Sequence, residues 1–202
     1  MQKFISLLSI LFALLSSATA QDQMFDICPM KVGENIPDSI MVTDVSGTPI
    51  LFGDAIKKDK AIIVFYRGGW CPYCTRHLSA LGQMKEEIEE LGYTLYGITP
   101  DQFDSLGVSQ VRSQSDYKIF SDSKVELITA FGLGWEVDDK NYVKYRDQYG
   151  MDTEEWSGET HHVLPVPAVY IIEDGVVQFN YVNPNYSVRL KPETLLAILK
   201  SY

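Results

Sequence analysis

The feature that most constrains the fold is the stretch 61–91, which predicts a buried strand, a tight turn and a long helix. Residues 61–66 form an unbroken apolar run rich in β-branched side chains, the pattern of a strand covered on both faces. From Thr75 to Leu91, apolar residues recur every three or four positions among charged ones, which predicts one amphipathic helix. The segment between the strand and the helix is Arg67-Gly68-Gly69-Trp70-Cys71-Pro72-Tyr73-Cys74.

The two cysteines of this segment are predicted to lie in the first turn of the helix. Pro72 suits that turn because its missing N–H is not needed there, so Cys71 begins the helix and Cys74 follows one turn later on the same side. Free N–H groups and the positive end of the helix dipole lower the pKa of such a thiol below its free value of about 8.5. We therefore expect a redox-active dithiol, with Cys71 as the more exposed, attacking sulfur and Cys74 as the resolving sulfur.

Two other roles for these cysteines remain open from the sequence. The pair could form a structural disulfide or, with His77, half of a zinc site. Zinc normally takes four ligands, and the sequence has no second cysteine pair to complete the set. Covalent haem is excluded because Thr75, and not histidine, follows Cys74. A dithiol that uses no metal and no cofactor is the favoured interpretation.

The first twenty residues have the pattern of a secretory signal peptide. Lys3 precedes an apolar stretch over residues 4–15, and Ala18-Thr19-Ala20 provides a cleavage site of small residues. An uncleaved membrane anchor is the alternative. We expect export to a periplasm or to the outside of the cell, no stable membrane insertion after cleavage, and one domain over residues 21–202.

The charge balance narrows the choice of partners. The chain has 17 basic and 27 acidic residues, and removal of residues 1–20 takes away one lysine, which leaves 16 against 27 and a net charge of −11. Such an acidic surface argues against nucleic acids and anionic membranes as partners. In an oxidising compartment, a CxxC pair that is to turn over as a reductant needs an external thiol donor.

The third cysteine, Cys28, precedes Pro29 in a segment, 21–36, that is predicted to be extended. It could be a third redox partner or a buried apolar thiol, and we favour the buried thiol.

The rest of the chain predicts alternating strands and helices, and therefore an α/β sheet with parallel strands. The expected strands are 40–45, 93–99, 119–120, 168–173 and 176–182, and the expected helices are 51–58, 101–112, 124–131 and 192–202. Asp174-Gly175 between two apolar runs predicts a hairpin.

Residues 134–164 interrupt this alternation and predict an insertion rich in aromatic and acidic residues. It could cover the active site or be a packed surface excursion. A metal site at His161-His162, near its end, is the less favoured interpretation.

Together these features resemble the thioredoxin superfamily. The motif Trp70-Cys71-Pro72-Tyr73-Cys74 matches its W-C-x-x-C between strand and helix, and Pro167, at the start of a strand, matches its cis-proline. The resemblance implies an α/β, thioredoxin-like fold with a central mixed sheet flanked by helices. It also implies that the substrate contacts residues beside the dithiol and the backbone beside the proline. These residues are Trp70, Pro72, Tyr73, Val166 and Pro167.

Within the superfamily, the chain resembles the peroxiredoxin-like AhpC/TSA (redoxin) group. The similar segments are residues 64–74, Phe120-Ser121-Asp122 with the helix 124–131, residues 164–167, and the tail 183–190 with Arg189. The peroxiredoxin motif is P-x-x-x-T-x-x-C. With Cys74 on its reactive cysteine, Arg67 replaces the Pro and Cys71 replaces the Thr. The group's thiolate-stabilising arginine has no counterpart between Thr160 and Ile172, which leaves Arg67, Arg76 or Arg189 to replace it.

Three functions are compatible with these residues. The resemblance favours a peroxiredoxin-like antioxidant, in which one thiolate attacks a hydroperoxide and the other cysteine resolves the sulfenic acid. The alternative is a thiol–disulfide oxidoreductase that acts on protein disulfides. A third is a copper carrier that uses Cys71, Cys74 and a histidine. Both enzymatic functions imply a peroxide or disulfide substrate and a thiol reductant such as a thioredoxin-like donor.

Overall fold

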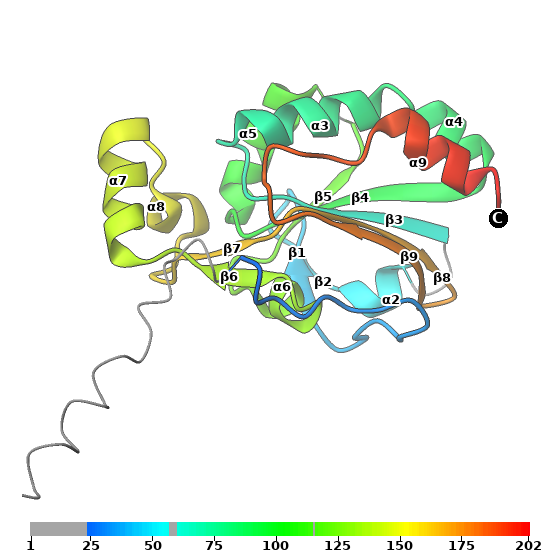
Figure 1. Cartoon of the computed structure of the whole chain (residues 1–202), viewed down its shortest axis with the longest axis horizontal. Helices are drawn as coiled ribbons and strands as arrows, with labels where there is room; N and C mark the ends of the chain where they lie inside the picture. The colour runs from blue at the N-terminus through cyan, green and yellow to red at the C-terminus, as the bar shows by residue number, and fades with distance from the viewer. Residues whose placement is uncertain (1–23, 57–59, 115) are drawn as a thin grey trace, which may run out of the picture.

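The computed structural model describes residues 24–56, 60–114 and 116–202, which form a seven-stranded mixed sheet with helices on both faces (Figure 1). From one edge to the other the strands are β2 (Pro49–Leu51), β1 (Met41–Thr43), β5 (Lys118–Ser121), β4 (Tyr93–Thr99), β3 (Lys60–Phe65), β8 (Ala168–Glu173) and β9 (Val176–Val182). Only β3, β4 and β5 run parallel to one another, and the other neighbours are antiparallel. The predicted α/β fold with a mixed sheet is confirmed. The predicted signal peptide lies outside the described residues.

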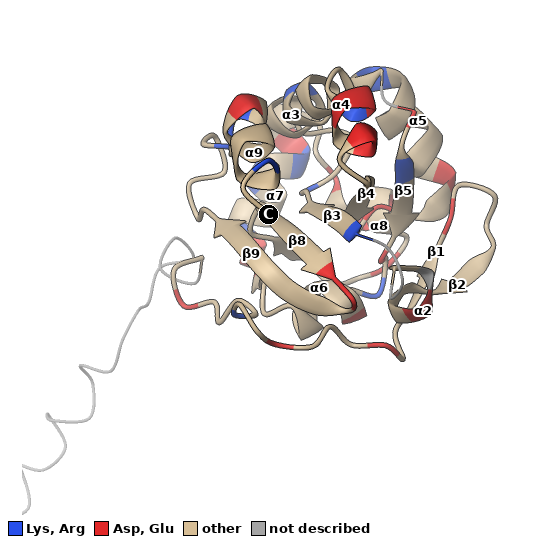
Figure 2. Cartoon of the chain, turned by 90° about the vertical axis from the view of Figure 1, so that its right-hand side faces the viewer, with Lys and Arg blue, Asp and Glu red and all other residues tan. Residues whose placement is uncertain are grey.

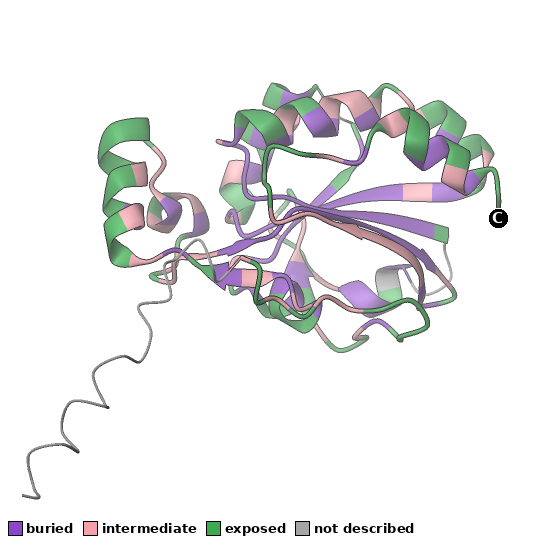
Figure 3. Ribbon diagram, viewed as in Figure 1, coloured by how far each residue is buried: buried purple, intermediate pink, exposed green. Residues whose placement is uncertain are grey.

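Two apolar layers lie between the sheet and its helices. One face is covered by α3 (Pro72–Gly82), α4 (Lys85–Glu90), α5 (Phe103–Ser113) and α9 (Pro192–Leu199), and the other by α2 (Phe52–Ile56) and α6 (Glu126–Ala130) (Figure 1). The central strands are buried along almost their whole length (Figure 3). Such two-sided burial explains why residues 61–66 read as an unbroken apolar run.

The prediction of one helix from Pro72 to Leu91 is wrong, because the segment folds as α3 and α4. Gly82 has low helix propensity, and the next turn tightens where the N–H of Met84 donates to the carbonyl of Leu81 at 3.0 Å, an i→i−3 bond. The apolar face survives the interruption, since Leu81 and Ile88 are both buried. Glutamates occupy most of the outer positions of α4, where the ribbon is coloured red for acidic residues in Figure 2.

Residues 134–164 form a small unit at one end of the sheet. A two-stranded antiparallel sheet, β6 (Gly134–Glu136) and β7 (Val163–Pro165), carries α7 (Asp139–Tyr149) and α8 (Thr153–Ser157) between its strands. Both helices begin at an aspartate that accepts backbone N–H bonds, Asp138 for α7 and Asp152 for α8. Most of α7 is exposed (Figure 3).

Within the described ranges, no helix is long and apolar enough to cross a membrane.

Candidate active site

The site lies where the parallel strands end. The carboxyl ends of β3, β4 and β5 meet at one edge of the sheet, the place where open α/β sheets carry their functional groups. The segment from Arg67 to Cys74 follows β3, Asp101 follows β4, and Asp122 follows β5.

The two cysteines occupy the predicted positions at the start of α3. Cys71 is the N-cap residue, Pro72 takes the first helical position, and the N–H groups of Cys74 and Thr75 both donate to the carbonyl of Cys71 at 3.0 Å. Both cysteines are free thiols. Both sulfurs are buried, and the predicted difference in exposure is very small, since Cys71 is 1% and Cys74 0% exposed. Both side chains belong to the apolar cluster between α3 and the sheet, with Leu78 and Val169.

Electrostatics separate the two thiols. The pKa of Cys71 is lowered to about 6, first because the Cys74 thiol donates a hydrogen bond to its sulfur, and then because of the charges of Arg67 and Arg189 and the Cys74 N–H. Burial, followed by the hydrogen bond and charge of Cys71, raises the pKa of Cys74 well above its ordinary value. At neutral pH, Cys71 is therefore a thiolate and Cys74 a thiol. This division fits the predicted roles of attacker and resolver.

Of the three arginines considered from the sequence, two act on the dithiol. Arg67 lies two residues after the end of β3 and lowers the pKa of Cys71. Arg189 places Nη2 3.5 Å from the Cys74 sulfur and donates from Nη1 to the carbonyl of Val188 at 3.0 Å. Arg76 lies instead over the exposed ring of Tyr73, with its Cζ 5.9 Å from the ring centroid.

His77 is buried in α3, three residues after Cys74, and is neutral. Its Nε2 lies 3.0 Å from the carbonyl of Leu190, and since a carbonyl only accepts, Nε2 carries the hydrogen. Burial, then the charge of Arg189, lowers the pKa of His77 to about 4. Its ring therefore contributes a hydrogen bond to the tail rather than a charge to the site.

Asp101 is a site residue that the sequence analysis missed. Its Oδ2 accepts the N–H of Gly69 at 2.7 Å, and Arg112 donates to the Gly69 carbonyl at 3.1 Å, so the peptide groups on both sides of Gly69 are held. A Cβ at Gly69 would lie 2.1 Å from Ser109 Oγ, which explains the glycine. Burial raises the pKa of Asp101 to about 7. Its place at the end of the strand beside β3 was the signal that could have found it.

The predicted substrate-binding residues fall into two groups. Trp70, Pro72 and Tyr73 lie at or near the surface beside Cys71, and Tyr73 packs edge-on against Tyr186, with ring centroids 5.7 Å apart. These three stay predictions, with a placement that suits contact with a substrate.

Val166 and Pro167 are buried instead. The Val166 N–H donates to the carbonyl of Leu133 at 2.8 Å, and the Pro167 carbonyl accepts from the N–H of Asn183 at 3.2 Å. The expected cis-proline is wrong, because none of the described peptide bonds is cis. The Val166 N–H and the Pro167 carbonyl are thus already bonded within the fold. A substrate role for either residue stays a prediction.

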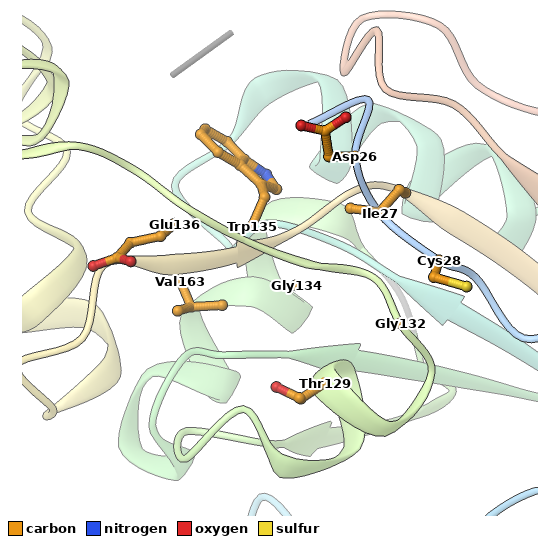
Figure 4. Close-up of a pocket in the computed structure, with 9 residues that line it drawn as sticks. All are labelled: Asp26, Ile27, Cys28, Thr129, Gly132, Gly134, Trp135, Glu136 and Val163. Carbon is orange, nitrogen blue, oxygen red and sulfur yellow. The ribbon is translucent and has the colours of Figure 1, made fainter. Parts of the chain in front are cut away.

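Cys28 lies on the surface, at the wall of a pocket of about 340 Å³ between the N-terminal segment and β6 (Figure 4). The preference for a buried apolar thiol is therefore wrong. The backbone here runs over the outside of the fold, joined to it by the bond from the Met30 N–H to the Phe131 carbonyl, 3.1 Å.

The two adjacent histidines do not act together. His161 Nε2 bonds the Ser123 carbonyl, whereas His162 Nε2 bonds Glu154 at 2.9 Å. Across residues 24–56, 60–114 and 116–202, no three His, Cys, Asp or Glu side chains gather as metal ligands would.

The fold and the dithiol define a thiol protein of the thioredoxin superfamily. The family model of AhpC/TSA matches residues 32–180 of the chain. The chain therefore belongs to the AhpC/TSA family, a group of thiol-dependent oxidoreductases.

The chain has low sequence identity to an individual curated relative. The chain is 27% identical to peroxiredoxin-like 2C of Bos taurus over 93 residues, 46% of this chain and 41% of that protein, so the match spans less than half of the relative.

Two solved structures share the fold. The peroxidoxin BcpB of Mycobacterium tuberculosis aligns with a TM-score of 0.65 at 18% identity, over 85% of this chain and 97% of its own. The reduced Prx3 of Vibrio vulnificus in complex with H2O2 aligns with a TM-score of 0.69 at 14% identity, over 85% of this chain and 96% of its own.

Proposed function

We propose that this chain is a peroxiredoxin-like enzyme that reduces hydroperoxides, with Cys71 as the attacking sulfur and Cys74 as the resolving sulfur. The observation that carries the proposal is the lowered pKa of Cys71, about 6, beside a Cys74 whose pKa is raised by burial. Peroxides react with the thiolate and not with the thiol, so the sulfur that is ionised at neutral pH is the one that attacks.

The two cysteines are sufficient to reduce the peroxide and form a disulfide. The Cys71 thiolate attacks one peroxide oxygen, the O–O bond breaks, and the alkoxide or hydroxide that leaves takes up a proton, so Cys71 becomes a sulfenic acid. The Cys74 sulfur then attacks Cys71, which forms the disulfide and releases water. A dithiol donor of the thioredoxin type returns two electrons and two protons. Because both sulfurs are buried, the substrate is a small one, such as hydrogen peroxide.

The proposal includes export, with residues 1–20 removed as a signal peptide. It is supported by the small-residue site at Ala18-Thr19-Ala20 after an apolar stretch. Amino-terminal sequencing of the protein isolated from its source tests it. A chain that begins at or just after residue 21 is expected, and one that begins at residue 1 would overturn it.

A second candidate function is thiol–disulfide exchange with proteins. The exposed pair Tyr73 and Tyr186 favours it, because an apolar surface beside the dithiol suits contact with a protein partner. The same Cys71 would attack the partner's disulfide.

One experiment separates these functions. Reduced protein is mixed with hydrogen peroxide in a single turnover, and free thiols and Trp70 fluorescence are followed. The peroxidase loses two thiols per peroxide at a rate far above that of an ordinary thiol. Slow oxidation with rapid reduction of a disulfide substrate would favour the second candidate.

Two variants assign the sulfurs. Cys71→Ser is expected to be inert to peroxide, and Cys74→Ser is expected to accumulate a sulfenic acid that dimedone traps. The reverse pattern would make Cys74 the attacker.

A further inference from the structure

Trp70, which directly precedes Cys71, connects the dithiol to the unit of residues 134–164. Its half-buried ring packs against the apolar cluster that contains Cys71 and Cys74. It also packs against a second cluster, whose buried members are Trp135, Val137, Tyr142, Leu164 and Val166. Tyr145 of α7 packs against the second cluster as well. A segment that covers Trp70 therefore covers one side of the active site.

The helix α8 faces Trp70 across a small cavity. Three residues of this helix line the cavity, Thr153, Trp156 and Ser157. Trp70 lines it together with Arg67. The space between these side chains is too small to hold a water molecule. A molecule that approaches Cys71 past Trp70 therefore meets a closed surface while α8 is in place.

Contacts of Trp156 and its neighbour hold α8 against α5. The backbone N–H of Gln102, the N-cap residue of α5, donates to the Trp156 carbonyl at 2.8 Å. The Gln102 side-chain amide donates to the carbonyl of Glu155 at 3.1 Å. In the last turn of α5, the Arg112 Cζ lies 5.5 Å from the centroid of the Trp156 ring, a distance at which a cation attracts an aromatic ring.

The packing between α8 and Trp70 is incomplete, because two buried polar atoms at the cavity lack hydrogen-bond partners within the described residues. They are Nε of Arg67, a residue that is 4% exposed, and Oγ1 of Thr153, which is 5% exposed. A buried polar group without a partner costs free energy that contact with water would restore. Movement of α8 away from Trp70 exposes both atoms to water, so opening on this side costs less than well-paired packing would require.

The tail between β9 and α9 covers the dithiol from another direction, and its polar groups are paired. Arg189 places Nη2 3.5 Å from the Cys74 sulfur, and His77 Nε2 donates to the carbonyl of Leu190 at 3.0 Å. Within the tail, the Asn185 side chain accepts from the N–H of Ser187 at 3.1 Å and from its hydroxyl at 2.7 Å. Of the two covers, α8 is therefore the one expected to open first.

We propose that α8 is a lid that limits, by size, the hydroperoxides that reach Cys71, and that Trp156 is the positioning residue that holds this lid closed. Hydrogen peroxide needs only small fluctuations of the lid, whereas a bulky organic hydroperoxide, such as cumene hydroperoxide, reacts only after α8 moves. The unit of residues 134–164 is then a cover of the active site rather than a surface excursion. This assignment rests on the proposed function, in which the Cys71 thiolate attacks a hydroperoxide.

The first test measures access to Cys71 without peroxide. Reduced protein is labelled with N-ethylmaleimide or with the larger N-(1-pyrenyl)maleimide. Tandem mass spectrometry of the peptide that holds both Cys71 and Cys74 gives the labelling rate at Cys71. Trp156→Ala is expected to raise the rate with pyrenylmaleimide about tenfold, which corresponds to a free energy of opening lower by about 1.4 kcal/mol. The rate with N-ethylmaleimide is expected to change much less.

Three further variants control this test. Trp156→Phe keeps a ring beside Arg112 and is expected to preserve the wild-type ratio of the two rates. Val143→Ala, at an exposed position of α7, is the matched control within the same unit and is expected to change neither rate. If Trp156→Ala fails to fold, Gln102→Ala removes only the side-chain bond to the Glu155 carbonyl and is expected to raise the ratio by less.

The second test compares single-turnover rates with hydrogen peroxide and cumene hydroperoxide. Trp156→Ala is expected to raise the rate with cumene hydroperoxide about tenfold relative to the rate with hydrogen peroxide. A ratio that is unchanged in Trp156→Ala but raised in Tyr186→Ala would place the route past the tail and overturn the lid, as would an unchanged ratio in every variant. Slow reaction of the wild-type protein with both peroxides would overturn the proposed function, and the maleimide ratio would still report on the lid.

Discussion

Asp101 predicts an unusual dependence of stability on pH. The carboxyl is buried, with a pKa raised to about 7 in the folded protein, against 3.8 for an ordinary aspartate. Between these values the folded state binds a proton that the unfolded state does not, so this group stabilises the fold at low pH, and the stabilisation is lost as pH rises through the folded pKa. From about pH 5 to about pH 8 the loss is on the order of 3 kcal/mol, at 1.36 kcal/mol per pKa unit.

The substitution Asp101→Asn removes this titration and keeps an oxygen that accepts the Gly69 N–H. Urea unfolding of the reduced proteins at several pH values gives the free energy of unfolding. Relative to the wild type, the variant is expected to gain on the order of 3 kcal/mol between about pH 5 and about pH 8. Asp122 and Cys71 also titrate in this range, but they are common to both proteins and cancel in the difference.

The control is Asp104→Asn, in an exposed side chain on α5, which is expected to leave the slope against pH unchanged. If the wild type and Asp101→Asn lose stability in parallel as pH rises, Asp101 is already ionised at about pH 5, and the burial argument for this carboxyl is refuted.

Four other substitutions test packing and the third thiol. Leu78→Ala, at a fully buried site in α3, should lower the free energy of urea unfolding by about 2–5 kcal/mol. A loss below about 0.5 kcal/mol, which is typical of substitutions at exposed sites, would contradict the observed packing. Gly132→Ala should destabilise, because its Cβ would lie 1.8 Å from the Cys28 carbonyl oxygen at a φ of +64°, whereas Gly107→Ala meets nothing within 4 Å and should stabilise α5 slightly in thermal melts. Cys28→Ser should leave peroxide turnover intact, and a large loss would make Cys28 a redox partner.

Local patterns in the sequence were sufficient to predict most elements. The strand 93–99 was predicted with the bounds of β4, and the hairpin at Asp174-Gly175 forms with both residues at positive φ. These elements succeed because burial period and turn chemistry are properties of neighbouring residues. The start of α3 at Pro72 follows from the same kind of local rule, which is why Cys71 and Cys74 were placed on the correct turn.

Local patterns do not predict which other parts of the folded chain pack against a given residue. The Cys71 side chain was expected to be the more exposed of the two because it begins the helix, yet both sulfurs are buried, because the sheet and the rest of α3 pack around them. Cys28 was misjudged in the opposite direction, since an apolar thiol in an extended segment carries no sign of which face of the fold the segment crosses.

By itself, the sequence determined the class of protein: a strand, a W-C-x-x-C turn and a helix define a dithiol on a thioredoxin-like sheet. Only the tertiary structure decided which charged groups act on the two sulfurs. Arg67 follows one strand, Asp101 the next, Tyr145 comes from α7 and Arg189 from the tail. Arg67 and Asp101 line one cavity because parallel strands end at one edge of the sheet, whereas the tail between β9 and α9 brings Arg189 to the dithiol. Charges affect a thiol through their distance in space rather than their separation along the chain.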